Sequence, residues 1–549
     1  MKFLKALINS LISGLFFSLL LTLLISYLNT NLDFDIIFLG QSTLSLSISY
    51  GLLVAIICLL VFFFLQFIFG SVKIALISPS FLMVSFSFLL LLFLVIFRVN
   101  YKYFLTIFNP EMRAMLKGQM IIIFVVAVLG LVSFYLYRYR KKVLFSLVYS
   151  VILGGALLSL TLQRLNYSPT PPSSRVANFE AKKIDRKITI IGLEGLTFDF
   201  IIPLISEEKL PNFSWFVEEG SWGKLESFSP NEPVVLNSSF NTGKYPFKHR
   251  QVSLYSYRLP PCKKKISVVP RSIFFRQLIR FGLLQIFPNK QPPSPKVNDI
   301  WKILEDNKIG YFNRDWPYMR ENVETSQEAE KLFIQFFEDL KYETSDIVAL
   351  AREAFLRDFE WENKAFQQKN QDKPQFFYLL LNGLNTVETY FYKYSFPDLF
   401  GNIEQEEINK YGNVIKKYYD FYDQIIGRYL ASLKEDELLI VYSPHGIEPL
   451  PLWKRYIEWI LGNSDVSAYH EDAPEGVIFF YGKGIVRGKN IEGMKIVDVA
   501  PTLLYYMGLP LGRDMDGVLM SSIFRDEFTS ENPIVYISSY EEIFIKTPF

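Results

Sequence analysis

The side chains that could perform chemistry are few in this chain, and most stand next to apolar runs. Only three histidines occur, at His249, His445 and His470. Glu194 directly follows the apolar run of residues 188–193, in a Gly-Leu-Glu-Gly turn. Imidazole and carboxylate groups are ligands for divalent metals. A lone buried histidine is more often a satisfied structural group, and Glu194 could equally cap a helix or face its dipole.

The elements that would position these groups follow from the apolar runs. Residues 188–193, 376–381, 438–442 and 476–481 have the composition of buried strands. Helical patterns lie between them, as in residues 328–367. Strands that alternate with helices predict a mostly parallel sheet covered by helices. Ligands bind at the carboxyl ends of such strands, so Glu194 is placed where a site would form.

Two stretches of this part of the chain lack a clear period. Residues 231–244 are dense in Ser, Asn and Gly, a composition that favours turns and caps. Residues 259–295 are rich in Pro and Lys and are expected to be irregular. A phosphate-binding loop is not indicated near residue 242, because the glycine spacing of that motif is missing.

The apolar excess of the sequence lies before residue 165 and predicts membrane helices. Five runs are long enough to cross a bilayer. They cover residues 8–28, 48–69, 74–97, 120–137 and 143–162. A Pro- and Ser-rich linker at 166–180 then leads to an outer domain, expected at 181–549 with an insertion at about 255–375. The predicted fold is therefore a multi-span helical membrane region followed by an α/β domain.

Lysine and arginine in short loops predict the orientation of the helices. Lys2 and Lys5, Lys73, and the basic loop at 138–142 fall on the cytoplasmic side if the five spans alternate, which puts the C-terminal domain outside the cytoplasm. The four basic residues between 98 and 117 fall on the opposite side and argue against this orientation. We expect an integral protein of the inner or plasma membrane. A net charge of +2 gives no support for nucleic-acid binding.

A series of phrases in the outer domain resembles the alkaline phosphatase superfamily, in its type I phosphodiesterase/nucleotide pyrophosphatase branch. The phrases are Ile-Ile-Gly-Leu-Glu-Gly at 190–195, Thr-Gly-Lys-Tyr-Pro-Phe-Lys-His at 242–249, Leu-Asn-Gly-Leu-Asn-Thr-Val-Glu-Thr at 381–389, Ser-Pro-His-Gly at 443–446, His470 ahead of Gly-Val-Ile-Phe-Phe-Tyr-Gly at 476–482, and Val-Asp-Val-Ala-Pro-Thr at 497–502. The resemblance covers about residues 188–522. It implies an alkaline-phosphatase-like fold. In that family two metal ions, usually zinc, and a Ser or Thr nucleophile cleave or transfer phosphate and sulfate esters.

The resemblance places the family's site on residues that have lost much of its chemistry. The nucleophile position falls on Pro233, and Ser238 or Ser239 would take the role only if the register slips. The positions that the resemblance assigns to metal ligands are Glu194, Asn385, Thr389, Pro444, His445 and His470. Only the two histidines are kept outright, and Glu194 is kept as a longer carboxylate. We therefore expect a pseudoenzyme with no metal and no catalytic residue.

Three functions remain open from the sequence. The first is a membrane-anchored, catalytically inactive binding or scaffolding subunit. It would bind an envelope protein or a phosphate- or sulfate-bearing glycan or lipid. The second is an active metal-dependent phosphodiesterase or headgroup transferase with a rebuilt site, in which zinc or another divalent ion is held by Glu194, His445 and His470. The third is a structural subunit of an envelope complex that works through its membrane helices.

Overall fold

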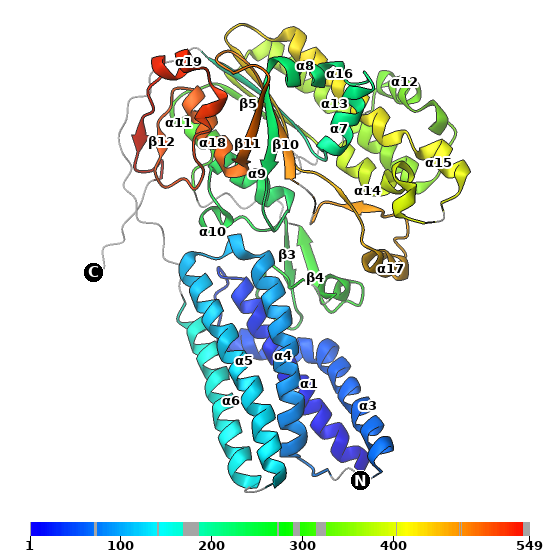
Figure 1. Cartoon of the computed structure of the whole chain (residues 1–549), viewed down its shortest axis with the longest axis vertical. Coiled ribbons are helices and arrows are strands. Elements are labelled where there is room, and N and C mark those ends of the chain that lie inside the picture. The colour runs from blue at the N-terminus through cyan, green and yellow to red at the C-terminus, as the bar shows by residue number, and fades with distance from the viewer. Residues whose placement is uncertain are drawn as a thin grey trace. The chain divides into compact units, whose positions relative to one another are not determined.

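The chain forms two compact units. A computed structural model describes residues 2–70, 74–139, 142–167, 186–271, 274–288, 297–314, 325–401, 403–471, 473 and 475–541. One unit, here called the helical unit, comprises Met1–Pro172 and Val252–Pro293. The other, here called the α/β unit, comprises Ser173–Gln251 and Ser294–Phe549. The chain therefore passes between the units three times, and Figure 1 labels the elements of each.

Five helices of the helical unit are long and apolar enough to cross a membrane, as the sequence predicts. They are α1 Lys2–Leu28, the run Ile36–Phe69 (α2 Ile36–Leu46, η1 Ser47–Gly51 and α3 Leu52–Phe69), α4 Pro79–Tyr103, α5 Pro110–Tyr139 and α6 Lys142–Leu165. A short η2, Leu105–Ile107, links α4 to α5. The predicted loop residue Lys73 and linker residues 168–180 lie outside the described residues.

Residues Val252–Pro293, which the sequence places in the outer domain, group instead with the helices. We call them the docking segment. Within it β3 (Tyr255–Arg258) pairs antiparallel with β4 (Gln285–Pro288), and η3 spans Phe275–Ile279. Two asparagines at the ends of α1 and α4 hold its backbone. The Asn29 Oδ1 accepts from the Val268 N–H at 2.9 Å, and the Asn100 Oδ1 accepts from the Arg271 N–H at 2.8 Å.

A seven-stranded sheet forms the centre of the α/β unit, with the order β11-β2-β10-β7-β1-β6-β5. Its strands are β1 Lys187–Leu193, β2 Ser221–Glu226, β5 Tyr311–Arg314, β6 Phe376–Leu381, β7 Glu437–His445, β10 Glu475–Gly482 and β11 Lys489–Lys495. Only β10 runs antiparallel to its neighbours, as the register with β7 and β2 shows. The sheet is thus mostly parallel, and the carboxyl ends of β1, β6 and β7 lie side by side at one edge.

Alternate residues of the central strands pack against helices on the two faces of the sheet, which is the pattern of a fully buried sheet. One face is covered by α7 Phe198–Ser206, α8 Pro211–Glu219, α12 Gln327–Phe336, α13 Asp346–Asp372, α14 Gly383–Ser395 and α16 Val414–Ser432. The other is covered by α9 Pro233–Thr242, α11 Ile300–Asp306, α18 Val499–Tyr506 and α19 Asp526–Glu531. Smaller elements are α10 Pro246–His249, α15 Gln405–Tyr411, α17 Leu452–Ile460, β8 Glu448–Pro449, β9 Ala468–Tyr469, β12 Leu511–Gly512, β13 Tyr536–Ile537, η4 Glu338–Leu340, η5 Pro397–Leu399, η6 Ile496–Asp498 and η7 Ser521–Ile523.

The structure corrects the two stretches that lack a clear period in the sequence. Residues 233–242, expected as turns, form α9. Its Ser and Asn side chains are buried, and hydroxyls such as that of Thr242 donate to the carbonyl one turn back, here Ser238 O at 2.7 Å. Residues 259–295, expected to be irregular, contain β4, which pairs antiparallel with β3.

Candidate functional site

The turn after β1 joins the ends of three strands. The Glu194 N–H donates to the Leu381 carbonyl at the end of β6, at 2.9 Å. The Gly195 N–H donates to Ser443 Oγ of β7 at 3.0 Å. That hydroxyl in turn donates to the His445 carbonyl at 2.7 Å. Glu194 is buried, so its carboxylate is fixed at the edge where the sequence places it.

Glycine is required at 195 for two reasons. Its φ of +103° lies in the region that side chains disfavour. A Cβ there would stand 2.5 Å from Glu388 Oε2 and 3.1 Å from the Asn385 backbone nitrogen. The turn of β1 is therefore packed directly on α14, which carries both of these residues.

Glu388 lies next to the candidate site, and the sequence pattern did not indicate it. Its side chain is fully buried, and burial raises the pKa of its carboxyl well above the usual value, against the opposing effect of the Tyr419 hydroxyl. The Tyr419 hydroxyl lies 3.4 Å from both Glu388 Oε1 and the Gly195 carbonyl. Glu388 stands among Leu384, Val387 and Phe391 on the apolar face of α14. An acid within such an apolar pattern is the sequence feature that could have indicated it.

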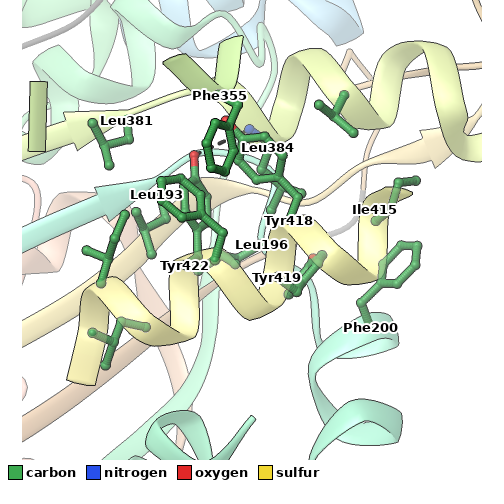
Figure 2. Close-up of a cluster of buried hydrophobic side chains, with 14 of the residues drawn as sticks. Leu193, Leu196, Phe200, Phe355, Leu381, Leu384, Ile415, Tyr418, Tyr419 and Tyr422 are labelled. Atoms are coloured by element: carbon green, nitrogen blue, oxygen red, sulfur yellow. Dashed lines mark hydrogen bonds between the residues drawn. The ribbon is translucent and has the colours of Figure 1, made fainter. Parts of the chain in front are cut away.

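A second buried acid, Asp358 of α13, lies on the same face of the sheet. It accepts from the Gly383 N–H at 2.9 Å and from the hydroxyls of Tyr418 and Tyr422 at 3.0 and 2.7 Å. Burial outweighs these bonds and raises the pKa of its carboxyl. Figure 2 shows the tyrosines of α16 within the apolar cluster beneath the turn, with Tyr418, Tyr419, Tyr422, Leu193, Leu196 and Leu384 labelled.

His445, the last residue of β7, is completely buried. Its Nδ1 lies 3.0 Å from the Gly446 carbonyl, which can only accept, so Nδ1 carries the proton and Nε2 is left as an acceptor. Among the described residues, Nε2 has no hydrogen-bond partner. Burial, together with the nearby charge of His470, lowers the pKa of His445 to about 3. The imidazole is therefore neutral across the physiological range.

His470 follows β9 and meets His445 ring to ring, with the centroids 4.8 Å apart and the planes 25° apart. The Asn231 Nδ2 donates to the His470 carbonyl at 2.9 Å. Asn231 stands two residues before Pro233, the first residue of α9. The start of α9, the end of β7 and the loop after β9 are thus connected at one place.

Asn385 and Thr389 lie one turn apart on α14. The Thr389 hydroxyl donates to the Asn385 carbonyl at 2.8 Å, and the Thr389 carbonyl accepts from the Ser467 N–H at 2.8 Å. Asn385 is in contact range of the Gly195 turn, as described above. Pro444 lies within β7. The structure therefore brings the positions that the resemblance assigns to metal ligands, from four separate segments, to one edge of the sheet.

The two alternative nucleophiles are engaged elsewhere. The Ser238 hydroxyl donates to the Val234 carbonyl at 2.7 Å and also contacts Gln251. The Ser239 hydroxyl lies 3.0 Å from His249 Nε2. Both serines are buried on α9. Neither hydroxyl is presented for attack on a ligand.

His249 serves the structure of this loop. Its Nδ1 accepts from the Gln251 N–H at 3.1 Å, so Nε2 carries the proton and donates to Ser239. Burial and the charge of Lys244 lower the pKa of His249 to about 3. The sequence-based expectation of a structural histidine is confirmed here.

The donor set at the edge does not fit the pair of metal ions that the family uses. Asn385 supplies a neutral amide, the Thr389 hydroxyl is bonded to its own helix, and Pro444 offers only a carbonyl. No group of three or more His, Cys, Asp or Glu side chains converges as a metal site among the described residues. Two cations need more carboxylate charge than Glu194 alone supplies.

Comparison with known proteins agrees with the sequence phrases. A family model described as type I phosphodiesterase/nucleotide pyrophosphatase matches residues 188–507, more than half of the 549-residue chain. Among solved structures, the chain matches the phosphonate monoester hydrolase SpPMH from Silicibacter pomeroyi at 13% identity, covering 62% of this chain and 76% of that one, with a TM-score of 0.36. No curated protein sequence matches the chain. This chain belongs to the type I phosphodiesterase/nucleotide pyrophosphatase family.

Proposed function

We propose that this protein is a membrane-anchored, catalytically inactive member of its family that acts as a binding or scaffolding subunit, with its α/β unit outside the cytoplasm. The observation that carries the proposal is Pro233. The sequence resemblance assigns the family's nucleophile position to this residue, which has no hydroxyl and begins α9. The nearest serines on that helix are bonded within the fold.

The state of the ligand positions supports the loss of catalysis. A phosphoryl transfer site stabilises negative charge with cations, and those cations need anionic ligands. Three of the six positions here are Asn385, Thr389 and Pro444, all neutral. The histidine that is kept on β7 is buried and stacks on a second imidazole.

The polar atoms at this edge favour ligands that donate hydrogen bonds over anionic ligands. The Oδ1 atoms of Asn231 and Asn385 and the Nε2 of His445 are buried acceptors without partners among the described residues. Acceptors attract hydrogen-bond donors and repel an unshielded phosphate or sulfate. Of the ligands expected from the sequence, the amides of an envelope protein and the hydroxyls of a glycan suit this edge better than an anionic headgroup.

The helical unit supports the proposed orientation. Lys2 and Lys5 stand at the start of α1, and Asn29 holds the docking segment just beyond its other end. The N-terminus and the segments that lead to the α/β unit therefore leave the bundle at opposite ends. With the basic N-terminus inside, the α/β unit lies outside.

Metal analysis and an ester assay on the purified full-length chain test this function. We expect no tightly held zinc after dialysis and no hydrolysis of phosphodiesters, phosphomonoesters or sulfate esters above the rate of the His445→Ala variant. That variant controls for contaminating esterases. Hydrolysis that His445→Ala abolishes, together with a retained metal ion, would overturn the proposal in favour of a rebuilt one-metal enzyme.

Restoring the family's residues at the edge tests the proposal in the opposite direction. The substitutions Glu194→Asp, Pro233→Thr, Asn385→Asp, Thr389→His and Pro444→Asp return the family's residues to the edge. If the fold still positions them, the rebuilt chain retains about two divalent ions, while the parent chain retains none. A parent chain that already binds as much metal as the rebuilt one contradicts the proposal.

A further inference from the structure

Helix α17, Leu452–Ile460, exposes its apolar side to solvent, unlike an ordinary surface helix. A helix on a soluble domain faces its apolar stripe to the core. Here the apolar stripe faces outward, at positions spaced along one side of the helix. The exposed fractions are 78% for Leu452, 58% for Trp453, 66% for Tyr456, 63% for Trp459 and 64% for Ile460. We call these five residues the α17 apolar face.

The opposite side of α17 fixes this orientation. The Arg455 Nη1 donates to the Leu399 carbonyl at 2.9 Å, and its guanidinium lies 3.8 Å from the centre of the Phe400 ring. The Lys454 ammonium lies 3.7 Å from the centre of the Tyr469 ring and 3.5 Å from Glu471. Lys454 and Arg455 therefore hold the helix on the domain, and the apolar side chains remain exposed.

The composition of the α17 apolar face fits the boundary between lipid and water. Trp and Tyr combine an apolar ring with a polar tip and concentrate at the level of lipid headgroups, and Leu and Ile add apolar area. A short helix with such a face lies in the plane of the membrane surface. A contiguous exposed apolar patch on a soluble domain marks an interaction site.

The same chain contains helices that are expected to lie in a bilayer. Five of its helices have the length and hydropathy of membrane spans. The chain passes between the helical unit and the α/β unit at three places, one of which, between Gln251 and Val252, lies within the described residues. An α/β unit tethered to membrane-spanning helices meets lipid surface at a local concentration that exceeds that of any dilute protein partner.

We propose that the α17 apolar face inserts into the headgroup region of the bilayer that the helical unit spans. The site edge would then be coupled to the membrane surface. Only residues 461–469 separate α17 from His470, and Lys454 contacts Tyr469 and Glu471 on either side of that histidine. The bilayer thus holds the loop that carries His470. This inference does not depend on whether the site is catalytic.

Tryptophan quenching by brominated lipids tests the proposal on the full-length chain. All seven tryptophans follow residue 186, so none lies in the predicted spans. In nanodiscs with one chain each, bromine on the upper acyl carbons should quench the emission of Trp453 and Trp459. The Trp453→Phe/Trp459→Phe variant should lose most of the quenching. Trp215→Phe, which removes a partly exposed tryptophan of α8, should retain it.

Three outcomes would overturn the proposal. Quenching that is absent from the parent chain means that another surface, or solvent, covers the face. Quenching that is equal in the double variant and the parent assigns it to other tryptophans. Quenching that appears only when two chains share a disc points to a second copy as the partner. The fluorescence and thermal unfolding of the variants in detergent show whether they are folded.

A charge variant provides an independent readout. Leu452→Asp/Ile460→Asp places two carboxylates on the face and leaves both tryptophans in place. We expect the brominated-lipid quenching to fall several-fold while the unfolding temperature in detergent is unchanged, because both side chains are exposed. Quenching equal to that of the parent chain contradicts the proposal.

Discussion

The imidazoles of His445 and His470 stack, with centroids 4.8 Å apart and planes 25° apart. This relationship brings together the end of β7 and the loop after β9, elements separated by α17 in the chain. Two positive imidazolium rings would repel one another at this distance in a buried place. The stacked pair therefore excludes a proton from His445, and the pH dependence of the fold should show it.

We expect His445 to remain neutral in the folded protein down to about pH 4. Its folded pKa is about 3, lowered first by burial and then by His470, whereas its unfolded value is near 6.5. The unfolded state therefore binds an extra proton between these values, so stability is lost as pH falls from 6.5 toward 3. The slope is about 1.4 kcal/mol per pH unit for one proton. Chemical unfolding of wild type and His445→Gln between pH 4 and 7 measures the difference.

Nitrogen NMR of labelled histidines checks the cause, since the chain has only three. His470→Gln removes the charged neighbour but not the burial, so the pKa of His445 should rise only partly toward its usual value. A His445 signal that titrates near pH 6.5 in the wild-type protein contradicts the expected neutral state of His445.

Glu388→Gln should stabilise the protein as pH rises. The folded carboxyl has a pKa well above its usual value because it is buried, so it holds a proton that the unfolded state loses above about pH 4.5. The stability contributed by the neutral acid is complete below that pH and is lost as pH rises toward the folded pKa. Glutamine is neutral at every pH, so the variant should unfold at higher denaturant at pH 8 and equally at pH 4. Glu435→Gln, an exposed position, serves as the matched control.

Gly195→Ala should lower the free energy of unfolding by about 1–3 kcal/mol from the left-handed backbone alone. The clash of its Cβ with Glu388 Oε2 adds to this loss. Gly310→Ala is the control, because no atom lies within 4 Å of its Cβ position. Equal stability of the two variants, measured by denaturant unfolding in the same detergent, would mean that the turn after β1 is not packed on α14.

Asn29→Ala should release the docking segment from the helical unit. It removes the bonds from the side chain to the Val268 N–H and to the Val268 carbonyl, the latter at 2.8 Å, and leaves buried peptide groups unsatisfied. That loss costs about 1–3 kcal/mol for each unsatisfied group. Trypsin should cut faster at Lys263, Lys264, Lys265 and Arg271. Asn31→Ala, an exposed neighbour, should cut at the wild-type rate.

The parts of the fold that depend on local pattern could be predicted from the sequence. Apolar runs of membrane length and the strands β1, β6, β7 and β10 are visible because burial on all sides demands continuous apolar side chains. Helix α9 is not, because its Ser and Asn side chains are buried by partners such as His249 that the pattern does not reveal. The β2 and β11 strands also escape prediction, since they contain Gly, Lys and Glu.

The place of the site in the fold could be predicted from the sequence, but the contacts within the site could not. The family phrases placed Glu194, Asn385 and His445 at one edge, and the structure brings their segments together. The burial of Glu388 and the stacking of His445 on His470 depend on contacts between residues far apart in the chain. No spacing of residue types encodes such contacts.

The docking segment has a practical consequence for anyone who handles this protein. Cutting the chain once between residues 168 and 185 would not release the α/β unit from the helical unit, since the chain still joins the two units at residues 251–252 and 293–294. A recombinant fragment that starts at residue 181 would carry Tyr257, Leu259, Ile266 and Val268 without the helices they pack on. Such a fragment would aggregate unless residues 252–293 were replaced by a short polar bridge.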